Sequence, residues 1–396
     1  MQKQSALTLR FCKNAQNNDI LIFSEDTSVT TYGQRLRLSV YGGSHDDEIG
    51  VKATGLPAGE EISIPELLAF MKRRAPGQNA YSTTRKESDT PVFLSGLTDG
   101  RTDGSPLHSV IYNTNQRSGD YTELLDIPRP SHADFAARMK YGDTVDLRGG
   151  GHFSGRLTAP ICILGGICLQ ILRKRRIHIA AHIASIGEVR DEPFDRVSLS
   201  EKDMEALCKK EFPTLSDEKG AKMRDLIESA RKRADSIGGT VECAAIGLPA
   251  GLGEHMFSGV EGRIAQIVFG IPGVKGLEFG NGFSGSTLFG SENNDPFYTD
   301  GRSVKTRTNN AGGILGGMTS GMPLVFTAAL KPTPSIGIPQ ESVSLSRMEN
   351  VRFTVKGRHD PCIVPRAVPV FEAATAIALV DLILSDAPLL LSESIK

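Results

Sequence analysis

The chain has 396 residues, of which 39% are hydrophobic and 23% charged, and it contains 42 glycines and no tryptophan. This apolar content is enough for a large core, so it excludes the disordered and low-complexity classes. The 45 basic and 46 acidic residues leave a net charge of −1. This balance argues against a protein that acts mainly by attracting nucleic acid, although it allows a local basic pocket.

The sequence shows no clear signal for secretion or for insertion into a membrane. No uninterrupted run of about 18 apolar residues occurs, so no membrane span is expected. The start, Met1–Ser5, lacks the hydrophobic stretch of a secretory signal. The six cysteines are scattered without a C-x-x-C pair, which argues against a disulfide framework or a structural zinc site. We expect a cytoplasmic protein with reduced thiols.

The chain begins with a segment of uncertain order. Residues 1–30 show no clear period and are interpreted as an N-terminal extension, followed by one folded unit over 31–396. Apolar and polar residues alternate over 36–40, which predicts a half-buried strand. A helix is expected from Ile64 to about Arg74.

Three further helices are expected in the second half of the chain. The clearest covers 217–237, where apolar residues form one stripe and a glycine pair closes the helix. The others run near 258–269 and from Pro369 to Leu384. Between the predicted elements lie three glycine-rich loops, at 148–155, 280–290 and 312–321.

A pentapeptide occurs twice. Gly-Leu-Pro-Ala-Gly stands at 55–59 and again at 247–251, each time after a predicted strand and before a predicted helix. The repeat leaves both an internal duplication and chance open. Because no low-complexity linker divides the chain, we expect a single intertwined α+β unit.

The common motifs of catalysis and cofactor binding do not occur. There is no P-loop and no dinucleotide fingerprint. His178 and His182 have the i, i+4 spacing of a metal-binding helix face, but they lie in an apolar run without the H-E-x-x-H glutamate. A structural role is the better interpretation.

Three loop segments pair a histidine with charged neighbours: 44–46, 129–134 and 358–366. Histidine exchanges a proton readily near neutral pH, and arginine binds two oxygens of a phosphate or carboxylate. Each segment alone is better explained as an ordinary loop whose histidine binds the backbone. Together they indicate a site for an anionic substrate with proton transfer.

Over roughly residues 31–385, the chain resembles the chorismate synthase family in the order of its sequence segments. Eleven segments carry the resemblance, in order and with similar gaps: GGSHDDEIG (42–50), RRAPGQ (73–78), TRKESD (84–89), RPSHADFAARMKYG (129–142), RGGGHFSGRLTA (148–159), GLPAGLGEHMFSG (247–259), GIPGVKGLEFGNGF (270–283), GSENNDPF (290–297), TNNAGGILGGMTSGMP (308–323), KPTPSI (331–336) and GRHDPCIVPRAVPVFEAA (357–374).

The resemblance implies a fold and a reaction. The fold would be a single large α+β domain over 31–396, a β-α-β sandwich, in a homotetramer. The reaction would be the 1,4-anti elimination of phosphate from 5-enolpyruvylshikimate 3-phosphate to give chorismate, the last step of the shikimate pathway. It would require reduced FMN from an external source, and neither nucleic acid nor a membrane would take part.

The resemblance also implies roles for individual residues. His45 would be the general acid for the leaving phosphate, His132 would manage protonation of the reduced flavin, and Asp360 would help flavin N5 act as base. The substrate's phosphate and carboxylates would be held by Ser44, Arg74, Arg129 and Arg156. FMN would be bound by His152, Phe153, Ser154, Pro272, Gly273, Gly316, Lys331, Pro332, Thr333, Pro334, Ser335 and Arg358.

The sequence departs from the family pattern in three loops. The common G-E-S-H-G reads Gly-Gly-Ser-His-Asp at 42–46, and R-S-S-A-R-E-T reads His-Phe-Ser-Gly-Arg-Leu-Thr at 152–158. Ala80 stands where some members have an arginine associated with nicotinamide binding, so a built-in flavin reductase is not expected. Two alternatives remain: a binding or regulatory protein on the same scaffold, and a generic flavin reductase.

Overall fold

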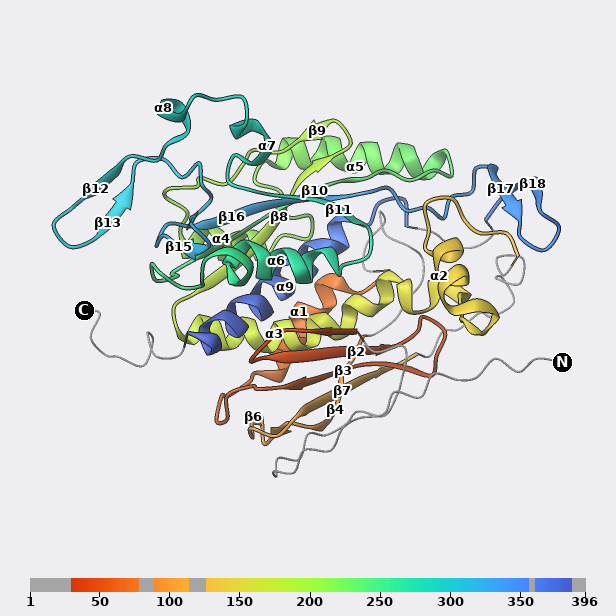
Figure 1. Cartoon of the computed structure of the whole chain (residues 1–396), viewed down its shortest axis with the longest axis horizontal. Helices are drawn as coiled ribbons and strands as arrows, with labels where there is room; N and C mark the ends of the chain where they lie inside the picture. The colour runs from red at the N-terminus through yellow and green to blue at the C-terminus, as the bar shows by residue number, and fades with distance from the viewer. Residues whose placement is uncertain (1–29, 78–88, 114–125, 356–359, 387–396) are drawn as a thin grey trace.

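The computed structural model describes residues 30–77, 89–113, 126–355 and 360–386. Its core consists of long helices enclosed by two antiparallel sheets (Figure 1). The first sheet has the order β1 (Thr30–Tyr32), β2 (Arg37–Gly42), β3 (Glu48–Thr54), β7 (Leu107–Tyr112), β4 (Val92–Ser95). The second has the order β11 (Val274–Phe279), β16 (Leu324–Leu330), β10 (Gly239–Ile246), β8 (His178–Ile186), β9 (Val189–Arg190). The expected α+β class is confirmed.

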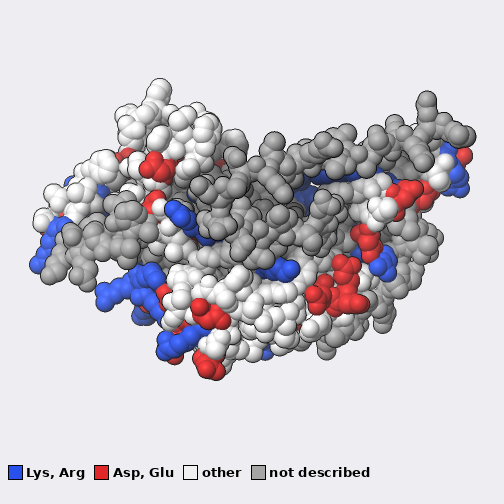
Figure 2. Space-filling model, turned by 60° about the horizontal axis from the view of Figure 1, so that its bottom comes forward, with Lys and Arg blue, Asp and Glu red and all other residues white. Residues whose placement is uncertain are grey.

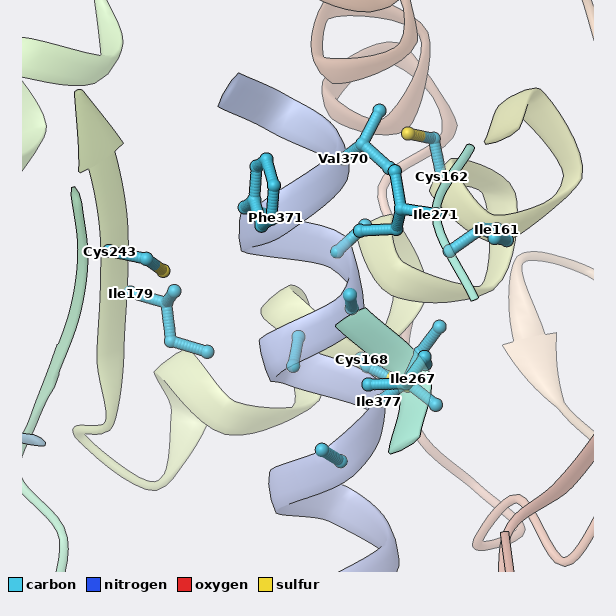
Figure 3. Packing of buried hydrophobic residues seen from close by; sticks show 14 of the residues in the cluster. Ile161, Cys162, Cys168, Ile179, Cys243, Ile267, Ile271, Val370, Phe371 and Ile377 are labelled. Carbon is cyan, nitrogen blue, oxygen red and sulfur yellow. The ribbon is translucent and has the colours of Figure 1, made fainter. Parts of the chain in front are cut away.

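The helices α1 (Ile64–Arg74), α3 (Thr158–Lys174), α6 (Val260–Phe269) and α9 (Val364–Ser385) pack between the sheets (Figure 1). Because α3 and α9 are apolar on all sides, they can only be stable when fully enclosed. Figure 3 shows Phe371 and Ile377 of α9 between Cys243 of the second sheet and Cys168 of α3. Both helices are long and apolar enough to cross a membrane, but they are core helices here, since 83% and 89% of their most apolar windows are buried.

The second sheet is covered on both faces. Its outer face packs against α4 (Glu201–Cys208) and α5 (Asp217–Lys232), and a second small core that includes Phe194 and Met204 forms there. Along β2 of the first sheet, Arg37 and Ser39 alternate with the buried Leu38 and Val40. This alternation confirms the strand expected at 36–40.

The smaller elements lie on the connections. They are β5 (Leu97–Thr98), β6 (Arg101–Thr102), α2 (Asp134–Tyr141), η2 (Gly142–Thr144), η3 (Arg148–Phe153), η4 (Gly155–Leu157), η5 (Met256–Ser258), α7 (Gly282–Gly285), α8 (Gly290–Asn293), β12 (Phe297–Thr299), β13 (Val304–Thr306), β14 (Ile314–Leu315), β15 (Met318–Thr319), β17 (Gln340–Ser344) and β18 (Glu349–Phe353).

Two predicted helix boundaries were wrong. Helix α5 ends at Lys232 rather than 237, because Ala234 takes a left-handed φ of +54° and reverses the chain. Helix α9 starts at Val364 and carries Pro369 in its interior. A proline there removes one helical hydrogen bond, and the nearly complete burial of the surrounding turns compensates for it.

The histidines at 178 and 182 lie on strand β8, not on a helix. His182 is fully buried between Asp191 and Glu242, 3.1 and 2.9 Å from its two ring nitrogens. The structural role expected for it fits these contacts.

Candidate active site

A cavity of about 810 Å³ opens where several elements meet, a volume typical of small-molecule sites. Its walls come from the C-terminal end of α1, the first turns of α3 and α9, the turn between α6 and β11, and the segment after β16. Both central helices therefore begin at the cavity, and the N-terminus of a helix favours anions.

The cavity is strongly cationic although the chain is nearly neutral. The described lining contains six basic side chains, Arg74, Arg129, Arg156, Lys275, Lys331 and Arg366, against one carboxylate, Asp360. The face shown in Figure 2, in contrast, has Lys and Arg interspersed with Asp and Glu over its described part. The positive charge concentrated in the cavity suits a ligand with several negative charges.

His45 lies in the β2–β3 connection beside a turn of three glycines. A Cβ on Gly149 would stand 2.3 Å from the His45 ring and 2.8 Å from the Ser44 hydroxyl, so only glycine allows this approach. Gly149 lines the cavity, and its φ of +57° also favours glycine. The Ser44 Oγ is buried without a hydrogen-bond partner in the described structure, as expected of a group kept for a ligand.

His132 lies beside the next glycine of the same turn. A Cβ on Gly150 would be 3.3 Å from its Nε2, so the imidazoles of residues 45 and 132 flank consecutive glycines. The Nδ1 of His132 is 2.5 Å from Asp134, whose pKa is held well below its usual range because hydrogen bonds from Arg129 and His132 outweigh burial. The ionised carboxylate places the ring proton on Nδ1 and leaves Nε2 to exchange a proton.

Burial lowers the pKa of His132, and the charges of Arg129 and Lys331 add to this against the pull of Asp134. The imidazole is therefore neutral at pH 7. Asp134 also accepts two hydrogen bonds of 2.7 Å from the Arg129 guanidinium, whose Nη1 donates to Ser335 at 3.0 Å. One buried carboxylate thus orients two of the predicted site residues.

A second buried carboxylate, Asp89, contacts Arg74 at 2.5 Å and also pairs with Arg156. Arg74 donates further to Thr158 Oγ1 at 3.1 Å and to the Gly155 carbonyl at 2.9 Å. Burial would raise the pKa of Asp89, but the two arginines outweigh it and lower the value. The carboxylate is therefore ionised.

Asp360 precedes α9 and is held by Arg366 at 2.5 Å. Thr333 donates its hydroxyl to the backbone carbonyl of Asp360 at 2.8 Å, which ties the 331–335 segment to the backbone at this residue. The hydroxyl proton of Thr333 is therefore already used in a hydrogen bond within the protein. Lys331 donates to the Ser131 carbonyl, and burial followed by the charge of Lys275 lowers its pKa.

The cavity brings together most of the predicted residues. Lining it are Arg74, Arg129, His132, His152, Phe153, Ser154, Arg156, Pro272, Gly273, Lys331, Pro332, Thr333, Pro334, Ser335 and Asp360. Three predicted residues that the structure describes are absent from this lining. Ser44 and His45 lie behind Gly149, and Gly316 lies exposed in the β14–β15 turn. Arg358 lies outside the described residues, as does Ala80.

Four charged residues of this site received no individual role from the sequence: Asp89, Asp134, Lys275 and Arg366, although Asp134 and Arg366 lie in two of the histidine-containing segments singled out above. All four stand inside segments that carry the family resemblance, so the signal was present. Their partners, however, are set by the fold. Only the tertiary structure brings Asp89 between Arg74 and Arg156.

A model described as chorismate synthase matches residues 36–384 of the chain, nearly all of the folded part. The chain belongs to the chorismate synthase family. A chorismate synthase of Lancefieldella parvula is 44% identical over 367 residues, covering 90% of this chain and 96% of the relative. One from Thermococcus gammatolerans is 43% identical, covering 88% and 96%, and one from Methanocaldococcus jannaschii is 40% identical, covering 90% and 97%.

Among solved structures, a crystal structure of chorismate synthase aligns with a TM-score of 0.69 and 28% identity. The alignment covers 89% of this chain and 93% of that one. Chorismate synthases therefore share both the sequence and the layered architecture described above.

Proposed function

We propose that this chain is an active chorismate synthase that eliminates phosphate from 5-enolpyruvylshikimate 3-phosphate to form chorismate. The observation that carries the proposal is the cationic cavity, which His132 and Gly149 line, with His45 directly behind Gly149. The substrate carries a phosphate and two carboxylates, which match the excess of basic side chains in the lining.

The leaving phosphate needs positive charge and a proton. We assign the proton donor to His45, which the fold places with Ser44 behind Gly149. Arg74, Arg129 and Arg156 would bind the substrate's phosphate and carboxylates, since the planar guanidinium can pair with two oxygens at once. Asp360, oriented by Arg366, would assist removal of the C6 proton.

The cavity residues fit reduced FMN as cofactor. Basic side chains and hydroxyls at Lys331 and Ser335 suit a flavin phosphate, while Pro272 and Phe153 offer apolar walls for a ring system. When bound, reduced FMN supplies an electron transiently and recovers it, so the reaction has no net redox change. His132 would hold or release a proton at Nε2 toward the flavin, and His152, fixed by a 2.9 Å contact from Nδ1 to the Gly42 carbonyl, would lie against it.

The proposal includes the cytoplasmic setting, the external source of reduced flavin and a catalytic domain over 31–396. It also includes a homotetramer. Large apolar side chains are exposed between 256 and 318, among them Phe257 at 92% and Phe283 at 80%, and such surfaces mark protein contacts.

An internal duplication is part of the same proposal. Strands β2-β3-β7-β4 and β8-β10-β16-β11 have the same pairing order, and a helix follows each pentapeptide. Thr102 Oγ1 donates to the Pro57 carbonyl at 2.5 Å, and Thr319 Oγ1 donates to the Pro249 carbonyl at 2.5 Å. Matching contacts at matching positions support a common ancestor of the two halves.

The test is anaerobic phosphate release from the substrate with chemically reduced FMN, with and without NADPH. Chorismate and phosphate should form in equal amounts without NADPH. Flavin binding without phosphate release would favour a binding protein on this scaffold, and NADPH oxidation alone would favour a reductase.

A further inference from the structure

We propose that Asp89 is a positioning residue that sets substrate affinity by fixing the spacing of Arg74 and Arg156. The inference rests on the proposed function, because it assigns these arginines to the substrate's anionic groups. Asp89 itself does not line the cavity, so it acts through the two guanidiniums.

The carboxylate of Asp89 lies between the side chains of Arg74 and Arg156. Oδ2 of Asp89 lies 2.5 Å from the Arg74 guanidinium, and Oδ1 pairs with the Arg156 guanidinium. Each carboxylate oxygen therefore binds one arginine. All three side chains are almost completely buried, at 1–6% exposure. A carboxylate with two oxygens at a fixed distance therefore works as a spacer between two cations.

The backbone at Asp89 is adapted to this task. Its φ of +48° lies in the left-handed region, where only glycine, asparagine and aspartate are common. The arrangement also fixes the charge: two guanidiniums and one carboxylate leave the group with a single positive charge. Without the carboxylate, two buried guanidiniums would repel each other and separate.

Each arginine has a second anchor from a different part of the chain. Arg74 binds Thr158 at the start of α3, and Arg156 donates to Asn113 Oδ1 at 3.1 Å after β7. These anchors hold the guanidiniums in the cavity wall but do not set the distance between them. Among the contacts between described residues, those of Asp89 alone join both guanidiniums, so its removal should disturb how the pair meets a phosphate or carboxylate.

The test compares Asp89→Asn and Asp89→Glu with the wild-type enzyme under anaerobic conditions with reduced FMN. We expect Asp89→Asn to raise KM for 5-enolpyruvylshikimate 3-phosphate at least tenfold while kcat falls less than threefold. Asp89→Glu keeps the charge and should lie closer to the wild type. In calorimetry, inorganic phosphate should bind at least tenfold more weakly to Asp89→Asn.

The control is Glu242→Gln, which also removes a buried carboxylate between two basic side chains, His182 and Arg196, but far from the cavity lining. It should lower the melting temperature and leave KM unchanged. An unchanged KM in Asp89→Asn, or an equal rise in Glu242→Gln, would overturn the inference. An inactive wild-type enzyme would instead count against the proposed function.

If Asp89→Asn does not fold, the Asp89→Glu variant decides. A KM for Asp89→Glu at least threefold above the wild-type value supports the spacer, because the longer side chain changes the distance between the guanidiniums. A wild-type KM in that folded variant would contradict it.

Discussion

At Gly149 the backbone passes so close to His45 that a Cβ there would stand 2.3 Å from the imidazole. We predict that His45→Ala reduces phosphate release about 10²–10⁴-fold, the usual contribution of a general acid. Flavin binding should survive, because the predicted FMN residues lie on other segments. Anaerobic assays measure the rate of phosphate release, and flavin fluorescence measures flavin binding.

His255→Ala is the matched control for this variant. His255 is an exposed histidine paired with Glu254 and does not line the cavity, so its removal should leave turnover unchanged. If His45→Ala loses flavin binding together with turnover, the general-acid assignment of His45 is wrong.

Helices α3 and α9 pack closely against each other at Gly165 of α3. A Cβ on Gly165 would stand 2.2 Å from the Ala373 Cβ. We therefore predict that Gly165→Ala destabilises the fold by about 1–3 kcal/mol through overpacking, although alanine favours helices. Urea denaturation gives the free energy of unfolding.

Gly262 on α6 provides the opposite case. It is exposed, and a Cβ there would meet its nearest neighbour at an ordinary 3.5 Å. Gly262→Ala should stabilise the protein by roughly 0.5–1 kcal/mol. Equal effects of the two substitutions would show that the α3–α9 contact is looser than described.

The contacts of His182 join β8 to β10 and predict a pH dependence of stability. Burial alone would lower the pKa of His182, but Asp191 and Glu242 outweigh it and raise the value. Its stabilising contribution is therefore complete below the unfolded-state pKa of about 6.5 and is lost as pH rises through the folded-state pKa. The neutral variant His182→Gln lacks this contribution.

The difference in unfolding free energy between the wild type and His182→Gln should thus shrink between pH 6 and pH 9. Urea titrations at pH 6, 7.5 and 9 measure this difference. A constant difference across the range would mean that His182 does not change its charge on folding.

Local signals explain which elements the sequence predicts well. Helix α1 begins and ends as expected, because Ser63 caps it and Pro65 stands in its first turn. The end of α5 and the start of α9 were predicted wrongly, since Ala234 and Pro369 take conformations that depend on their surroundings. The same holds for the site. Family motifs predict its arginines and histidines, but the sequence does not show that Asp89 and Asp134 orient them, because these contacts depend on the tertiary structure.

For the whole molecule, the contact between Arg263 and Asp381 joins distant parts of the chain. Asp381 at the end of α9 accepts the backbone N–H groups of residues 34–36 and pairs with Arg263 of α6 at 2.5 Å. We predict that Asp381→Asn costs about 3–5 kcal/mol, because it leaves a buried guanidinium without its counter-charge. Chemical denaturation measures the loss.

Glu228→Gln is the control for that prediction. It removes an exposed partner of Arg231 on α5 and should cost less than about 1 kcal/mol. A small effect of Asp381→Asn, similar to that of the control, would show that the contact does not hold the two halves together.

The position of α9 at the end of the described chain affects synthesis on the ribosome. Helix α3 emerges long before α9, its main packing partner, has been translated. Until then a nascent chain exposes an apolar helix that would otherwise be enclosed, and such surfaces recruit chaperones or aggregate. Premature termination before residue 364 should therefore yield inclusion bodies rather than a smaller folded enzyme.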